Sequence, residues 1–178
     1  MSNSPKKALV RRFTGDTLTG YLPQSGFVRQ NSLDLLDLSG RLMSLSLNDI
    51  KMVSYVRDFN LNDPVNPERL ARRTFLARPR SEGLWLRLTF RSGDILEGLA
   101  PTDRTLLDAL ADDDGLFLTP PDTRSNTQRL YVPRAALTEV QLLAVITTPS
   151  RRQPLPADRE NLQDELFHLP IDPASRPN

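Results

Sequence analysis

The sequence predicts an all-β protein made of two similar halves. Gly15-Asp16-x-Leu18-x-Gly20 recurs, with identical spacing, as Gly93-Asp94-x-Leu96-x-Gly98. Apolar and polar residues alternate around both copies, which is the period of a β-strand. Similarity between two segments of one chain indicates a repeated structural unit. The predicted organisation is a first unit at 7–56, a connector at 57–83, a second unit at 84–146 and a tail at 147–178.

The first unit is predicted to contain strands at 7–13, 17–22, 26–38, 42–47 and 50–56. Gly15-Asp16 joins the first two as a hairpin, because glycine supplies the positive φ that a tight turn needs. Ser39-Gly40 makes a later turn, and Asn48-Asp49 leads into the closing strand.

The connector is predicted to carry a short helix. Asn66 can cap its first turn and Pro67 can stand at its first position, with Glu68 in the first turn and Arg69, Arg72 and Arg73 on one face. The second unit repeats the hairpin around Gly93-Asp94, and residues 106–111 are more helix-like than strand-like. Its predicted strands are 84–90, 94–99, 116–118, 130–132 and 137–146.

The tail differs in composition from the rest of the chain. Prolines recur at 149, 154, 156, 170, 173 and 177 among mostly polar residues, so the segment is predicted to be disordered. Asp158 could cap a short helix that ends near Phe167. Whether that helix docks on the rest of the chain or stays unattached is left open by the sequence.

Apolar residues of the strand patterns form the predicted core. They are Phe13, Leu18, Leu47, Ile50 and Val53 in the first unit, and Phe90, Leu96, Val132, Leu137 and Val140 in the second.

Composition limits the classes of function. The net charge is +1, so no strong overall field attracts nucleic acid or an anionic membrane. The absence of cysteine excludes disulfides and thiolate chemistry. No long apolar run is present, so the chain is expected to be cytoplasmic with no membrane insertion.

The order of strands and turns resembles the Sm-like fold and, more broadly, SH3-like barrels. This resemblance implies two tandem small β-barrels, at 7–56 and 84–146. Sm-like proteins bind RNA and form rings, and their closing hairpin usually carries Arg-Gly or Lys-His. Here the corresponding turns read Asn48-Asp49 and Pro133-Arg134, so the RNA-contacting residues do not match.

A closer resemblance is to an uncharacterised bacterial family of tandem small barrels. It rests on the strand at 50–59, Ile-Lys-Met-Val-Ser-Tyr-Val-Arg-Asp-Phe, and on the loop at 121–126, Pro-Asp-Thr-Arg-Ser-Asn. Such domains occur alone or beside PilZ and other signalling modules. The resemblance covers about residues 7–146 and implies no particular activity.

The connector holds the candidate site, an anion- or nucleotide-binding cluster of Arg69, Arg72, Arg73, Arg78 and Arg80. Planar guanidinium groups suit phosphate recognition. Arg69 and Arg73 also match the Arg-x-x-x-Arg spacing with which PilZ domains hold cyclic di-GMP. The alternative is a solvated helix face whose arginines pair with Asp63, Glu68 and Glu82.

The sequence therefore predicts a non-enzymatic binding or adaptor module in bacterial signalling or regulation, with a protein partner. The alternatives are RNA or cyclic dinucleotide binding through the connector arginines, and an enzyme. His168 is the only histidine, so neither a His-based catalytic triad nor a transition-metal site is expected, and no motif for a cofactor is present.

Overall fold

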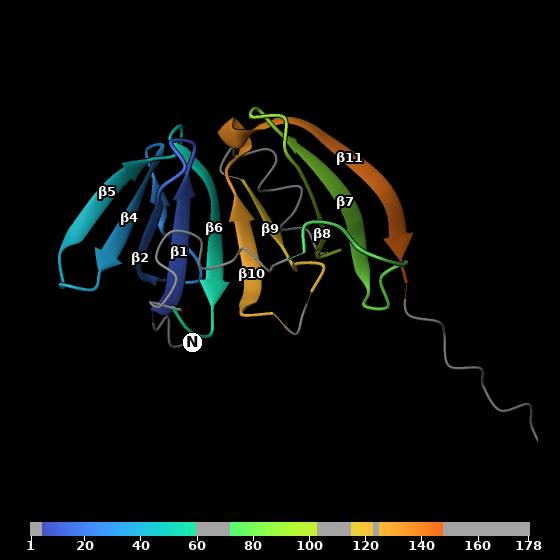
Figure 1. Cartoon of the computed structure of the whole chain (residues 1–178), viewed down its shortest axis with the longest axis horizontal. Coiled ribbons are helices and arrows are strands. Elements are labelled where there is room, and N and C mark those ends of the chain that lie inside the picture. The colour runs from blue at the N-terminus through green and yellow to red at the C-terminus, as the bar shows by residue number, and fades with distance from the viewer. Residues whose placement is uncertain (1–4, 60–71, 103–114, 123–124, 148–178) are drawn as a thin grey trace, which may run out of the picture. The chain divides into compact units, whose positions relative to one another are not determined.

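A computed structural model describes residues 5–59, 72–102, 115–122 and 125–147 of the chain. These residues fall within one compact unit, Met1–Thr148. The predicted all-β class is confirmed, and the strands appear in Figure 1. They are β1 (Lys6–Arg12), β2 (Thr17–Leu22), β3 (Val28–Arg29), β4 (Ser32–Asp37), β5 (Leu42–Ser46), β6 (Ile50–Val56), β7 (Gly83–Phe90), β8 (Ile95–Ala100), β9 (Leu116–Leu118), β10 (Thr127–Val132) and β11 (Leu137–Ile146).

Strands β1–β6 form the first half. They pair side by side in the order β5-β4-β2-β1-β6, and β3 adds to the end of β4. The last strand therefore returns to pair with the first, and β6 runs antiparallel to β1.

Strands β7–β11 form the second half and pair in a matching order. β11 lies beside β7, and β7 beside β8. β8 then meets β9 through the bridge between Leu99 and Thr119, and β9 pairs with β10. The order β11-β7-β8-β9-β10 thus repeats that of the first half, strand for strand.

Backbone hydrogen bonds show which residues correspond. Gly15 N donates to Arg12 O at 3.1 Å, and Gly93 N donates to Phe90 O at 2.8 Å. The predicted Gly-Asp hairpins are therefore confirmed, with both glycines at positive φ. Phe13 N donates to Asp49 O, and Arg91 N donates to Ala136 O, both at 3.0 Å. Phe13 thus corresponds to Arg91, and the start of β6 to the start of β11.

The second glycine of each motif lets its strand approach the neighbouring strand closely, and we call these two places the strand crossings. A Cβ at Gly20 would lie 2.4 Å from Leu36 O, and one at Gly98 would lie 2.9 Å from Leu118 Cβ. Any side chain at either position would collide with the neighbouring strand, which explains why both copies keep glycine there.

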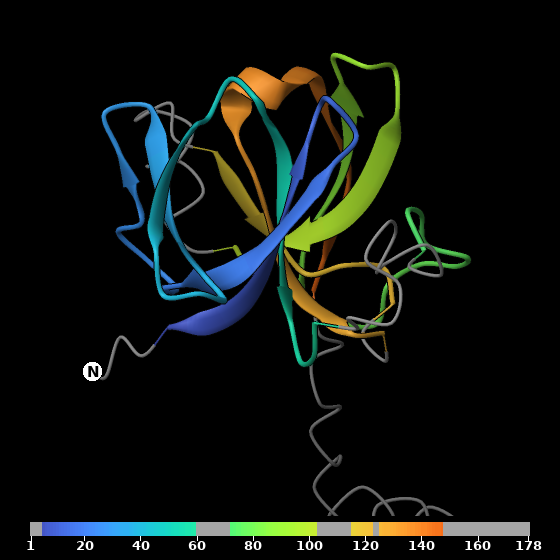
Figure 2. The same cartoon turned by 60° about the vertical axis from the view of Figure 1, so that its left-hand side comes forward.

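Each half surrounds its own cluster of buried apolar side chains, and the strands curve around it (Figures 1 and 2). The first cluster contains Val10, Leu33 and Ile50, and the second contains Leu88, Leu118 and Val132. Apolar residues on alternate strand positions supply both clusters, as the period-two pattern predicts.

The halves are joined through β6 and β10, which pair antiparallel and make one continuous sheet. Tyr131 of β10 is buried in the first cluster, with its ring 5.0 Å from that of Phe27. Lys51 of β6 forms an ion pair with Asp94 in the β7–β8 turn. Each half therefore completes the packing of the other.

Some sequence expectations need correction. The predicted strand at 26–38 is two strands, because Gln30 and Asn31 take positive φ and form a turn between β3 and β4. Arg72 and Arg73, which the predicted helix included, are not helical. The remainder of that helix, the helix-like residues 106–111 and the tail from residue 148 lie outside the described residues. No helix within the described ranges is long and apolar enough to span a bilayer.

The predicted core is right at six positions: Leu47, Ile50, Val53, Phe90, Leu96 and Val132 are buried. Leu18, Leu137 and Phe13 are only partly buried. Phe13 packs against the second cluster, and Arg91 stacks on its ring with 3.9 Å between guanidinium carbon and ring centroid. Val140 is 42% exposed, so its assignment to the core is wrong.

Candidate functional site

Two long strand edges pair with no other described strand. One is the side of β5 that faces away from β4, and the other is the side of β11 that faces away from β7. We call these two sides the open edges. They lie at opposite ends of the row of strands in Figure 1. Such an edge presents unpaired N–H and C=O groups, which makes it a template for another strand.

Exposed apolar side chains gather beside the open edges. Leu42 on β5 is 68% exposed, and Leu142 on β11 is 54% exposed. The large apolar residues exposed near the β5 edge are Leu36, Leu38 and Leu42, and those on β11 are Val140, Leu142 and Val145. Only Leu76 and Ile95 are comparably exposed elsewhere in the described part of the chain. Apolar side chains that gather in this way mark a binding surface.

The contrast between β6 and β11 shows what a partner does to such an edge. The two strands hold the same place in their halves, after matching turns and beside the first strand. Five of the seven residues of β6 are buried, whereas Ile146 alone is buried in β11. β6 is covered because β10 pairs with its outer edge.

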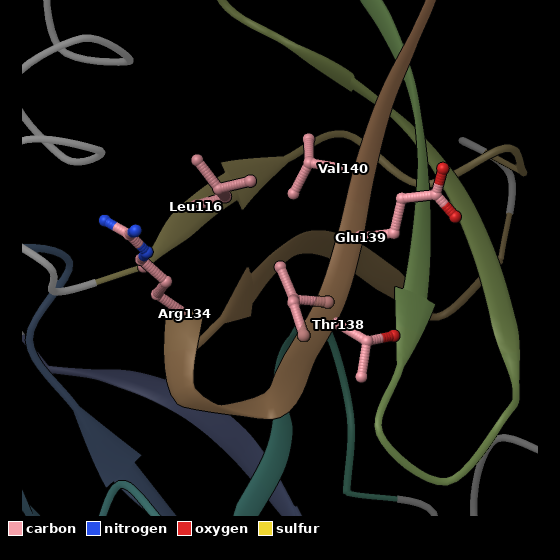
Figure 3. A pocket seen from close by; sticks show the side chains of 7 residues that line it. Leu116, Arg134, Thr138, Glu139 and Val140 are labelled. Atoms are coloured by element: carbon pink, nitrogen blue, oxygen red, sulfur yellow. The ribbon is translucent and has the colours of Figure 1, made fainter.

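A pocket of about 440 Å³ opens beside β11. Figure 3 shows Val140 pointing toward Leu116 of β9, while Glu139 projects from the other side of β11. Arg134, which precedes β11, lines the same pocket. The pocket is thus an apolar recess with a guanidinium group at its margin, suited to an apolar side chain of an incoming segment.

The connector arginines are only partly described. Arg69 lies outside the described residues, so the structure does not test its convergence with the others. Arg72, Arg78 and Arg80 are exposed and form no ion pair with any described residue. Arg73 is held, because its side chain pairs with Asp94 at 3.3 Å and its carbonyl accepts a hydrogen bond from Glu97 N at 2.7 Å.

Glu97 of β8 is a buried carboxylate that the sequence did not single out. It accepts hydrogen bonds from Phe75 N at 3.0 Å, Trp85 Nε1 at 3.2 Å and Arg87 Nη2 at 2.8 Å. Burial raises the pKa of Glu97, but these hydrogen bonds and the Arg87 charge outweigh it and leave the pKa below its ordinary value. Its oxygens are fully engaged, so Glu97 fastens residues 73–75 to β8.

Sequence reasoning missed Leu42, Leu142 and Val145. The signal was present in the composition of the strands, since β5 carries no charge and β11 carries only Glu139 among ten residues. Edge strands of soluble proteins usually carry lysine or proline that discourages pairing. A long apolar strand without them indicates an edge that has a partner.

The chemistry available at this surface is recognition by backbone and apolar side chains. Among the described residues, no three His, Asp or Glu side chains are grouped to hold a metal ion. Comparison with curated proteins and with solved structures gives no significant match. Residues 4–144 match the sequence profile of DUF6982, a family of unknown function. The chain therefore belongs to this family.

Proposed function

We propose that the chain is a non-enzymatic binding module, an adaptor in bacterial signalling or regulation, that binds a protein segment at its open edges. The observation that carries this proposal is the gathering of exposed apolar side chains at β5 and β11. A segment in extended conformation gains main-chain hydrogen bonds when it adds to a sheet edge, and alternate side chains give specificity.

The architecture that goes with this proposal is a pair of Sm/SH3-like small barrels. The matching strand orders of the two halves support it, as do the glycines at the two strand crossings. A cytoplasmic location agrees with the absence of cysteine, because secreted domains of this size often carry disulfides.

Selection from a displayed library of random peptides, with the full chain as bait, tests the proposal. Selected peptides should alternate apolar and polar residues, and Leu42→Arg or Leu142→Arg should remove their binding. Ile95→Arg is the matched control, because Ile95 is 45% exposed but lies away from both open edges. Absence of enriched peptides, or binding that resists both edge variants, would refute strand capture.

Anion binding is a second candidate, supported by the exposed guanidinium groups of Arg72, Arg78 and Arg80. Its ligand would be RNA or a cyclic dinucleotide. Titration of the full chain with a short RNA and with cyclic di-GMP at low salt tests it, beside the Arg72→Ala/Arg78→Ala/Arg80→Ala variant. RNA affinity should fall steeply with added salt. No binding of either ligand by the parent chain would remove this candidate.

A further inference from the structure

We infer that the partner of the open edges is a second copy of this chain, with β5 of one copy adding antiparallel to β11 of the next. This inference rests on the proposed function and names the segment that each edge takes. The chain already covers one edge of this kind, that of β6, with its own strand β10.

The β6–β10 pairing is the covered version of the same contact. β6 is the closing strand of the first half, and β11 is the closing strand of the second. β10 lies at the end of the second half's pairing order that is opposite to β11, and β5 lies at the end of the first half's order that is opposite to β6. We call β10 and β5 the end strands. Within the chain, the closing strand β6 therefore pairs with the end strand β10, which leaves the closing strand β11 and the end strand β5 at the open edges.

The strands can be matched residue by residue. Val53 pairs with Val10 and Val140 pairs with Leu88, and Val10 and Leu88 hold matching positions before the two Gly-Asp turns. Val53 therefore corresponds to Val140, and Tyr55, two residues later in β6, corresponds to Leu142.

The end strands match in the same way. Leu36 pairs with Tyr21 and Thr119 pairs with Leu99, at matching positions after Gly20 and Gly98. On its other side, Leu36 pairs with Leu42. Leu130 pairs with Leu118, so in antiparallel order the preceding residue, Arg129, stands opposite Thr119. Leu42 therefore corresponds to Arg129. Ser44 lies two residues after Leu42 and Tyr131 lies two residues after Arg129, so Ser44 corresponds to Tyr131.

Transferring the known register gives the contact between copies. In the covered pairing, Tyr131 lies opposite Val53 and Arg129 lies opposite Tyr55. The same register places Ser44 opposite Val140 and Leu42 opposite Leu142. The most exposed apolar residue of β5 thus meets the most exposed apolar residue of β11, although the register follows from the strand pairing alone and not from exposure. Directly opposed apolar pairs stabilise an antiparallel sheet.

This contact joins two different surfaces, so it is head-to-tail. Such an interface builds a ring when its rotation closes and a filament when it does not. A self-complementary dimer, β5 on β5 or β11 on β11, would not place Leu42 opposite Leu142.

Complementation between two variants of the full chain tests the inference. By sedimentation velocity the parent should form oligomers whose size grows with concentration. Leu42→Arg and Leu142→Arg should each weaken association about ten-fold or more, the loss expected when a charge replaces a central apolar contact. Ile95→Arg should associate like the parent.

Mixing the two edge variants is the diagnostic step. Leu42→Arg keeps an intact β11 and Leu142→Arg keeps an intact β5, so the mixture should form a one-to-one dimer that grows no further. Continued association of either variant alone would indicate a self-complementary contact and overturn the head-to-tail register.

The failure of this inference is distinguishable from that of the proposed function. A parent chain that stays monomeric at about 1 mM excludes a second copy as the occupant. If that monomer still binds selected peptides in a manner sensitive to Leu42→Arg or Leu142→Arg, the edges take another protein and the proposed function stands. If it binds none, both proposals fail.

Discussion

Val53 and Val140 hold the same place in the two halves, yet Val53 is fully buried and Val140 is 42% exposed. Each lies opposite a buried residue of its half's first strand, Val10 or Leu88. The difference arises on the other side of the strand, where Tyr131 of β10 lies opposite Val53. Among the described strands, none lies opposite Val140 at that side.

The first prediction concerns Tyr131, which belongs to one half by sequence and to the core of the other by packing. Tyr131→Ala should destabilise the chain by about 3–5 kcal/mol, because it removes a buried ring that contacts Phe27 and Phe117. Unfolding in urea measures the loss. Tyr131→Phe is the control, since it keeps the ring and should cost less. Equal stability of Tyr131→Ala and the parent would contradict the shared core.

The second prediction concerns the strand crossings. Gly98→Ala should cost about 1–3 kcal/mol, because its Cβ would lie 2.9 Å from Leu118 Cβ and force the strands apart. Gly20→Ala should cost as much or more, since the collision there is with the carbonyl oxygen of Leu36. Thermal melts of both variants measure these losses. Two melting temperatures unchanged from the parent would show that the crossings are loose.

The third prediction concerns acid. The pKa of Glu97 is lowered in the folded chain, so its charged form stabilises the fold fully above the ordinary value of 4.5. That contribution is lost as the pH falls through the lowered pKa of the folded state. Urea unfolding from about pH 7 to about pH 3 should therefore show a decline that is shallower in Glu97→Gln. An identical decline in both proteins would remove Glu97 as a source of acid sensitivity.

The fourth prediction separates association from folding. Leu42→Arg and Leu142→Arg replace exposed side chains, so each should change the free energy of unfolding by no more than about 0.5 kcal/mol at concentrations where the parent is monomeric. Dilute urea melts measure this. A large loss in either variant would mean that the side chain packs within its own chain, and its effect on oligomers would then be indirect.

The sequence predicted the parts of the fold that local chemistry decides. The hairpins at Gly15-Asp16 and Gly93-Asp94 follow from positive φ, and the burial of Leu47 follows from the alternation of apolar and polar residues over 42–47. The turn at Gln30-Asn31 was missed, because neither residue is glycine although both take positive φ. Asparagine tolerates that conformation, and the pair stood within an apolar run.

The candidate site was harder to predict because it depends on which strands meet. The apolar pattern of the last strand placed Val140 in the core but could not tell that no described strand would cover it. Nor could such a pattern place Tyr131 in the core of the other half, because that contact follows from the β6–β10 pairing between distant segments. The arginines of the connector were predicted as a site because several of them occur in a short segment. Leu42 and Leu142, in contrast, resemble ordinary strand residues until the pairing order is known.

The central claim is that β11 has an open edge where β6 has a covered one, and amide hydrogen exchange of the full chain measures this most directly. At high dilution, alternate amides of β11 should exchange much faster than the matching amides of β6, since only β6 is paired on both sides. As the concentration rises, the β11 amides and those of β5 should become protected together. Protection of β11 equal to that of β6 at the lowest concentration would contradict the claim.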